Sequence, residues 1–339
     1  MSKSPDRDNG RRNALKALSA SALAASGLFS WGAHGQQPEI RKVALGQAKS
    51  AGQSAQIPLA IANNMFAADG LEVSISYFNS AAEMNEALVG GALNITATGD
   101  VPAIGLMAAK GPAKCLAPLA DFSIDQALVV KKAITNPKQL EGAKLGLTKG
   151  TVATMLIELY AKRNGLDTNK LGLIHMSAPD QIPAFISGDI DGIVSWEPWV
   201  WTALQKVPGA HVMQRGPGLF TTYNLLLVHE PFLAKNPNTV KAVLRTLLRA
   251  NDEIHSTAGE RAAAKSILAN EAPGMPEDVL LKMIEARKYT MTIDPTLVDG
   301  LQKMTDFLYS VQRINRRASV SEWLVPGPLR EVRPSLVKI

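Results

Sequence analysis

The chain has 339 residues, of which 46% are hydrophobic and 19% charged, and its formal net charge is +6. These values are typical of a globular protein and exclude a disordered or membrane-embedded chain. Basic residues do not alternate with aromatic ones along any stretch, so the excess charge does not indicate nucleic-acid binding.

The N-terminal residues have the composition of an export signal. Arg11 and Arg12 precede a run of Ala, Leu and Ser, and Ala33-His34-Gly35 forms a small-x-small cleavage site. This order is typical of a removable leader, and paired arginines indicate the twin-arginine route. The apolar run, residues 17–31, is shorter than the ~20 residues that span a bilayer. We expect a signal peptide over residues 1–35, removed on export to the periplasm; an amphipathic N-terminal helix is the alternative.

Strand and helix patterns alternate after the leader. Residues 42–45 and 72–78 are predicted strands, and residues 57–68 and 82–89 are predicted helices. The same alternation returns over residues 144–205, which predicts an α/β fold with largely parallel sheets. After a strongly apolar strand, the chain becomes mainly helical. That strand covers residues 223–228, and the helices cover 237–256, 259–269 and 276–289.

One α/β unit is used twice in the sequence. Ser80-Ala81 precedes a helix that ends in Gly90-Gly91, and Ser177-Ala178 precedes a similar helix that ends in Gly188, at an offset of 97 residues. Chance similarity among α/β units is the alternative explanation. We expect two lobes on a common plan, with a ligand cleft at the carboxyl ends of their strands. Lobe 1 is predicted to hold residues 36–126 and 224–339, and lobe 2 residues 127–223, with two crossings forming a hinge.

Motifs for covalent or cofactor chemistry are missing from the sequence. It contains no Gly-x-Ser-x-Gly, no P-loop and no dinucleotide fingerprint, and its five histidines lack metal-ligand spacing. The single cysteine, Cys115, lies in an apolar stretch and is expected to be a core residue, with a nucleophile as the alternative. We therefore expect a protein that binds no cofactor and is not an enzyme.

Residues suited to binding lie where predicted strands end. Lys149-Gly150-Thr151-Val152 begins a helix, whose free N–H groups and neighbouring lysine attract an anion; a plain capped helix start is the alternative. Ser80 is a helix cap that can also contact a ligand. The remaining candidates from this reasoning are Gln47 in the first loop, Gly99 and Asp100 before a third helix, and Tyr223 at the second crossing.

Three of the five tryptophans lie in the segment Trp196-Glu197-Pro198-Trp199-Val200-Trp201. The offset of 97 residues pairs Trp196 and Glu197 with Gly99 and Asp100 in the other lobe. Trp196 is expected to cover the apolar part of a ligand, and Glu197 to accept a hydrogen bond from an amino group. Core packing is the alternative, above all for Trp199 and Trp201.

These motifs together resemble a known family. The leader, the duplicated lobes, Thr98-Gly99-Asp100, Leu147-Thr148-Lys149-Gly150-Thr151 and Ser195-Trp196-Glu197-Pro198 look like those of the nitrate/sulfonate/taurine-type solute-binding proteins of ABC importers. The resemblance covers about residues 40–323. It implies a two-lobed periplasmic-binding-protein fold with two interlobe crossings (type II). It also implies a monomer that captures a small anionic or zwitterionic solute by lobe closure and delivers it to an ABC permease and its ATPase, its only link to a membrane.

The chain departs from sulfonate binders of that family at the second helix start. Val152 stands where they often have a hydroxyl, and the histidine that often follows is missing. Asp100 and Glu197 also add negative charge, which an amino-bearing or neutral solute would fit better. The solute stays open among sulfonates, taurine, nitrate, pyrimidine precursors and aromatic acids. Two other functions also stay open: a desulfinase-like enzyme that uses Cys115, and a periplasmic sensor for a membrane kinase.

Overall fold

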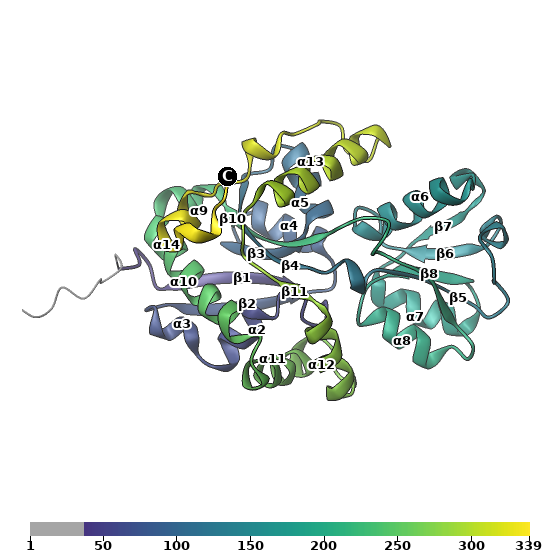
Figure 1. The fold of residues 1–339 in the computed structure, drawn as a ribbon, viewed down its shortest axis with the longest axis horizontal. Coiled ribbons are helices and arrows are strands. Elements are labelled where there is room, and N and C mark those ends of the chain that lie inside the picture. Colours follow the sequence, from purple (N-terminus) through teal and green to yellow (C-terminus); the bar gives the residue numbers. More distant parts are fainter. Residues whose placement is uncertain (1–36) are drawn as a thin grey trace, which may run out of the picture. The chain divides into compact units, whose positions relative to one another are not determined.

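The computed structural model describes residues 37–339, so the expected leader lies outside the described residues. Two mixed sheets organise the described part of the chain, and helices cover both faces of each (Figure 1). We call the elements around the six-stranded sheet the larger lobe and those around the five-stranded sheet the smaller lobe. None of the described helices is long and apolar enough to cross a membrane.

The six-stranded sheet has the order β11-β4-β10-β3-β1-β2. Strand β1 pairs in parallel with β2 and β3, whereas β10 runs antiparallel to β3 and β4, and β11 antiparallel to β4. The strand bounds are Lys42–Ala48 (β1), Glu72–Phe78 (β2), Ile95–Gly99 (β3), Ala113–Asp121 (β4), Tyr223–His229 (β10) and Lys288–Tyr289 (β11).

The five-stranded sheet has the order β7-β6-β8-β5-β9. Strand β6 pairs in parallel with β7 and β8, and β5 runs antiparallel to β8 and β9. Its strands are Ala127–Val130 (β5), Lys144–Leu147 (β6), Gly172–His175 (β7), Gly192–Ser195 (β8) and His211–Arg215 (β9). Each sheet thus has three parallel strands followed by antiparallel strands in the same spatial order, so the two lobes share the common plan that the sequence repeat predicts.

The expectation of largely parallel sheets is corrected by this arrangement. The chain leaves the larger lobe through β4 and β5 and returns through β9 and β10. Because β5 and β10 enter their sheets from the other lobe, they run against the parallel strands. The fold has the two interlobe crossings implied by the resemblance, while the lobe boundaries at residues 126/127 and 223/224 stay a prediction.

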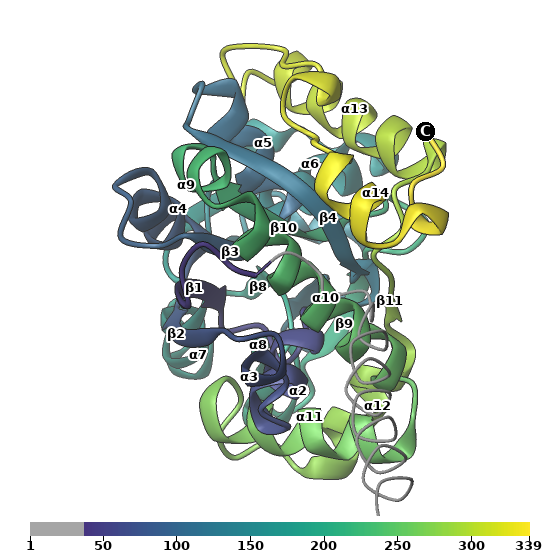
Figure 2. The ribbon, with the colours of Figure 1, turned by 90° about the vertical axis from the view of Figure 1, so that its left-hand side faces the viewer.

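Helices α4, α5 and α13 lie on one side of the larger sheet, and α2, α3, α10 and α11 on the other (Figure 1). Figure 2 shows α10 running between α2 and α14, which it contacts. The bounds are Gln56–Ala62 (α2), Met65–Ala68 (α3), Ala81–Val89 (α4), Asp100–Ala108 (α5), Glu230–Lys235 (α9), Pro237–Glu253 (α10), Thr257–Asn270 (α11), Glu277–Ala286 (α12), Pro295–Ser310 (α13) and Gly327–Val332 (α14).

The smaller lobe has one helix on one face of its sheet and two on the other. Helix α6 (Val152–Asn164) covers one apolar cluster, and α7 (Ala178–Ser187) and α8 (Trp199–Lys206) cover the other. The start of α6 also joins the larger lobe's core, because Val152 and Met155 belong to that cluster. The two lobes therefore touch at the first turns of α6.

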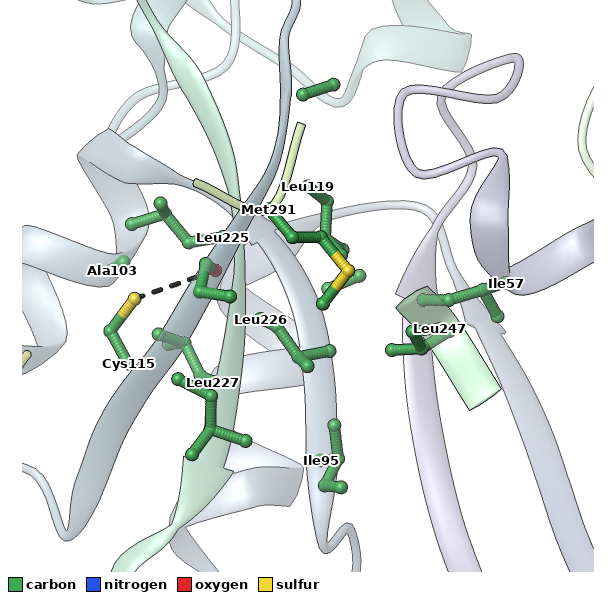
Figure 3. Close-up of a cluster of buried hydrophobic side chains, with 14 of the residues drawn as sticks. Ile57, Ile95, Ala103, Cys115, Leu119, Leu225, Leu226, Leu227, Leu247 and Met291 are labelled. Atoms are coloured by element: carbon green, nitrogen blue, oxygen red, sulfur yellow. Dashed lines mark hydrogen bonds between the residues drawn. The ribbon is translucent and has the colours of Figure 1, made fainter. Parts of the chain in front are cut away.

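Cys115 lies inside the larger lobe's core, fully buried. Figure 3 shows its thiol among apolar side chains that include Ala103, Leu225 and Leu227, and the thiol donates a weak hydrogen bond to the carbonyl of Ala117 at 3.8 Å. Burial raises the pKa of the Cys115 thiol to about 12. This environment suppresses the thiolate that a nucleophile requires.

Candidate functional site

The carboxyl ends of β1, β3, β6 and β8 carry the polar segments that the sequence singled out. After β1, a buried turn places Ala51 at a φ of 47° and Gly52 at 84°. A Cβ on Gly52 would lie 2.5 Å from Cδ1 of Ile267, so both the backbone angle and the space require glycine. A residue of β11 also holds this turn in place, because the hydroxyl of Tyr289 donates a hydrogen bond to the carbonyl of Gly52 at 2.8 Å.

A buried carboxyl, Glu271, organises the same turn. It accepts the backbone N–H of Ser50 at 3.3 Å and of Gly52 at 3.1 Å, and the side-chain amide of Gln47 at 2.6 Å. Burial raises the pKa of Glu271 to about 7, although these hydrogen bonds act in the opposite direction. Gln47 therefore has a partner in the protein and positions the loop.

Asp100 ties the start of α5 to the second crossing. Its carboxylate accepts the hydroxyl of Thr222 at 2.6 Å and the backbone N–H of Tyr223 at 2.9 Å. Only 1% of the residue is exposed, and burial raises its pKa to about 6 against the effect of these hydrogen bonds. The neighbouring Gly99 is the N-cap residue of α5.

In the smaller lobe, β6 leads into α6 through Lys149, Gly150 and Thr151. Thr151 caps the helix by accepting the backbone N–H of Ala153 at 3.3 Å and donates its hydroxyl to the carbonyl of Thr148 at 2.8 Å. The backbone N–H of Lys149 donates to Nδ1 of His175 at 3.2 Å. The hydroxyl of Thr151 is therefore already used by the helix cap.

Trp196 and Glu197 follow β8 and are almost fully buried. The Glu197 carboxylate accepts the backbone N–H of Trp201 at 2.8 Å and pairs with Arg215 at 3.5 Å. Burial and then the charge of Asp125 raise its pKa to about 7. Glu197 thus satisfies a backbone N–H group in the first turn of α8.

A small cavity of about 50 Å³ lies between these strand ends. We call it the inner chamber. It takes its lining from the loop after β1, the start of α5, both crossings, the start of α6 and the segment after β8, and none of its lining residues is charged. The lining residues are Ala48, Ser50, Gln53, Ala81, Gly99, Pro102, Phe122, Gln126, Thr151, Val152, Trp196 and Asn224.

A second cavity of about 350 Å³ shares Pro102 and Thr151 with the first, and we call it the outer chamber. Its walls are mainly apolar, from Val101 and Leu106 on α5, from Leu308 on α13 and from Ile314 beyond it. Lys149 and Arg313 also line it, and Arg313 forms an ion pair with Glu158 of α6. The two chambers are therefore neighbours, and each takes lining residues from both lobes.

A match to a known protein family covers most of the chain. Residues 36–269 match the model of the NMT1-like family. The chain belongs to this family.

Named relatives of this NMT1-like protein are binding proteins. It is 26% identical over 262 residues to the "Putative aliphatic sulfonates-binding protein" of Escherichia coli, covering 74% of this chain and 78% of that one. It is 28% identical to the taurine-binding periplasmic protein of the same organism over 198 residues, covering 57% of this chain and 61% of that one.

Solved structures share the two-lobed fold. The alkanesulfonate-binding protein SsuA of Xanthomonas axonopodis pv. citri, bound to MOPS, superposes with a TM-score of 0.74 at 18% identity, covering 85% of this chain and 99% of that chain. The desulfurization enzyme DSZB superposes with a TM-score of 0.65 at 14% identity, covering 87% and 99%. At these identities the structural likeness shows the fold, which is common to binding proteins and at least one enzyme.

In this NMT1-like protein, some sequence candidates line the inner chamber, some line the outer chamber, and some line neither. Gly99, Val152 and Trp196 line the inner chamber, and Thr151 lines both chambers. Three more line the outer chamber, namely Ser80, Lys149 and Gly150. Four line neither chamber, namely Gln47, Asp100, Glu197 and Tyr223, and the first three of these hold loops and helix starts in place.

Sequence reasoning missed eight of the twelve residues that line the inner chamber, among them Gln126, Asn224 and Phe122. Gln126 lies one residue before β5 and Asn224 is the second residue of β10, so both belong to the crossings. A signal was present for Asn224, since it is a polar residue at the start of a strand whose next four residues are apolar. A buried amide in such a strand needs a partner, and a ligand can supply it.

A buried ion pair beside the first crossing was also missed. Arg287, which follows α12, contacts Asp125 at 2.9 Å, with side-chain exposures of 0% and 3%. Burial alone would lower the pKa of Arg287, but the Asp125 carboxylate raises it above its usual value. Arg287 also donates to the carbonyl of Ala51 at 2.5 Å, so one cation joins the first loop to the hinge.

Proposed function

We propose that this protein captures a small solute between its two lobes in the periplasm and passes it to an ABC permease driven by an ATPase. The inner chamber carries the proposal, because residues from both lobes and both crossings line it. A rotation about the crossings would bring the lining residues of the two lobes together or move them apart, which is how hinged binding proteins trap a ligand. The named sulfonate- and taurine-binding relatives support the same function.

Within this proposal, the sequence candidates have two roles. Gly99, Thr151, Val152 and Trp196 contact the solute, with Ser80, Lys149 and Gly150 around its outer part. The others, Gln47, Asp100 and Glu197, position the segments that make contact, through the hydrogen bonds described above. Tyr223 has its backbone N–H held by Asp100 and its side chain outside both chambers.

The direct test is a thermal-shift screen with taurine, alkanesulfonates, nitrate, pyrimidine precursors, aromatic acids and uncharged small solutes. A solute present at a hundred times its Kd stabilises the folded state by about 2.7 kcal/mol. We expect at least one compound to raise the melting temperature. A screen in which no compound does so would contradict a solute-binding function.

Trp196→Ala tests whether that compound binds in the inner chamber. Trp196 is 8% exposed and lines the chamber, so its removal should weaken binding by about tenfold or more. Trp199→Ala is the matched control, because Trp199 packs on the smaller lobe's core and lines neither chamber. Isothermal titration calorimetry should show a loss of solute affinity only for Trp196→Ala. Equal solute affinities in the two variants would show that the solute does not bind in the inner chamber.

A cysteine-dependent enzyme is the second candidate, favoured by the likeness to the desulfurization enzyme DSZB. Cys115 lies outside both chambers and its thiol is buried, with a pKa raised to about 12. We therefore propose a non-enzymatic role. In the folded protein Cys115 should not react with iodoacetamide at pH 8, whereas rapid alkylation without unfolding would favour the enzyme.

A further inference from the structure

The inner chamber contains amide groups that have no partner in the protein. Gln126 is 1% exposed and Asn224 is 3% exposed. Within residues 37–339, neither the nitrogen nor the oxygen of the Gln126 side chain has a hydrogen-bond partner, nor does Oδ1 of Asn224. Buried polar groups of folded proteins are normally paired. Two buried amides on the wall of one cavity therefore indicate a ligand that pairs with them.

The amide chemistry limits what that ligand can be. Each amide side chain presents one oxygen that accepts and one NH2 group that donates, whichever way it is turned. A sulfonate, nitrate or carboxylate only accepts, so it would leave the oxygens of Gln126 and Asn224 buried without a donor. A group that carries both N–H and C=O satisfies both kinds of atom.

The charged residues around the inner chamber also favour an uncharged ligand. No lining residue is charged, and the cations nearby are already paired, the buried Arg287 with Asp125 and the partly exposed Arg215 with Glu197. An anionic head would lose its hydration here without gaining a free cation, which is strongly unfavourable in a buried site. An uncharged polar head loses much less.

The outer chamber also has unpaired polar atoms on a mainly apolar wall, with Lys149 and Arg313 as its charged lining residues. Asn85 donates its side-chain amide to the carbonyl of Pro102 at 3.1 Å, which fixes its other atom, Oδ1, as an acceptor. That oxygen has no partner among the described residues, and neither has the hydroxyl of Thr154. Leu106, Leu308 and Ile314 supply the apolar walls. This chamber fits a short apolar body.

We infer that the preferred solute carries an uncharged amide or urea-type head, held in the inner chamber by Gln126 and Asn224, on a short apolar body that occupies the outer chamber. The inference rests on the proposed solute-binding function and names its ligand class. It differs from the anionic or zwitterionic solute that the sequence resemblance implies. A site built to hydrogen-bond a substrate N–H rejects analogues that lack it by large factors.

The test compares four compounds that share one alkyl chain and differ in the head group. Hexanamide, pentylurea, hexanoate and pentane-1-sulfonate all carry a pentyl chain, and titration calorimetry at pH 8 keeps both acids ionised. We expect the two uncharged compounds to bind at least tenfold more tightly than the two anions. If an anion binds as tightly or more tightly, and Trp196→Ala weakens it, the binding function stands and the amide inference fails. If neither this series nor the wider screen binds, both fail.

Gln126→Leu separates recognition from structure. Replacing the unpaired amide by a hydrocarbon of similar length should leave the melting temperature of the free protein unchanged or higher, while affinity for hexanamide falls at least tenfold. Thr96→Val is the matched control, because the hydroxyl of Thr96 is also buried and unpaired within the described chain but lines neither chamber. Unchanged hexanamide affinity in Gln126→Leu would overturn the assignment, and so would an equal loss of affinity in both variants.

Discussion

At the scale of single residues, the residues that hold the site in shape differ from those that face the chambers. Glu271, Asp100 and Glu197 each accept backbone N–H groups of a strand-end segment, and none lines either chamber. The lining of the inner chamber is neutral, and several of its polar atoms have no partner among the described residues. Since charged residues draw attention in a sequence, Asp100 and Glu197 were easier to identify than Gln126, whose importance depends on its burial.

Gly52 provides a test of the first loop. Gly52→Ala forces a φ of 84° on a residue with a Cβ and places that atom 2.5 Å from Ile267. Backbone strain and overpacking together should lower the free energy of unfolding by about 2–4 kcal/mol.

Gly142→Ala is the matched control for this variant. It has a similar φ of 87° and nothing within 4 Å of the added Cβ, so it reports backbone strain alone, about 1 kcal/mol. Urea denaturation measures both variants. Equal losses would show that the packing against Ile267 contributes nothing.

At the scale of elements, the sequence predicted the parallel strands and most helices but not the joins between them. The helix expected over residues 57–68 is broken into α2 and α3 at Asn64, which has a φ of 51°. The helix expected to reach residue 289 ends at Ala286, because Lys288–Tyr289 pairs with β4 instead. Hydrophobic periodicity does not report such long-range pairing.

The candidate site follows the same division. Residues next to a strand end, such as Thr151 and Trp196, could be placed from local pattern alone. Gln126 and Asn224 could not, because the two crossings bring them together from positions 98 residues apart in the sequence. The pairing of Arg287 with Asp125 likewise joins elements 162 residues apart.

The Arg287–Asp125 pair should stabilise the junction between the first loop and the first crossing. Arg287→Met leaves the Asp125 carboxylate buried without its cation, which should lower the free energy of unfolding by about 3–5 kcal/mol. Arg317→Met is the control, since Arg317 pairs with Asp306 at the surface and its loss should be below about 1 kcal/mol. Chemical denaturation giving similar values for the two would contradict a structural role for the buried pair.

At the scale of the whole molecule, three buried carboxyls make stability depend on pH. Burial raises the pKa of Asp100 to about 6 and those of Glu197 and Glu271 to about 7. Each group holds its proton more tightly in the folded than in the unfolded state. Its contribution to stability is therefore fully present below the unfolded pKa of about 4 and is lost as the pH rises through the folded value.

We expect the melting temperature to fall between pH 5 and pH 8. Glu271→Gln should flatten this slope, because a glutamine stays neutral at every pH in this range. If the Gln47 amide rotates by half a turn, its unpaired oxygen can accept a hydrogen bond from the NH2 group of the new glutamine. Melting curves at several pH values measure both. A melting temperature that rises up to pH 8, or a Glu271→Gln slope equal to that of the wild type, would contradict this account.

The repeated unit explains how one chain forms a cleft. Two sheets with the same strand order present their parallel strand ends to each other, and the proposed lobe closure would take place about the crossings β4–β5 and β9–β10. The sequence repeat contained this symmetry, since an offset of 97 residues relates Gly99 to Trp196. Both residues line the inner chamber.

Small-angle X-ray scattering with and without a solute tests the central claim most directly. The sample is the chain from residue 36 onward, and the solute is the compound that gives the largest thermal shift. We expect the radius of gyration to decrease on saturation, and Trp196→Ala to require a higher solute concentration for the same decrease. Saturable binding with an unchanged radius of gyration would contradict capture by lobe closure.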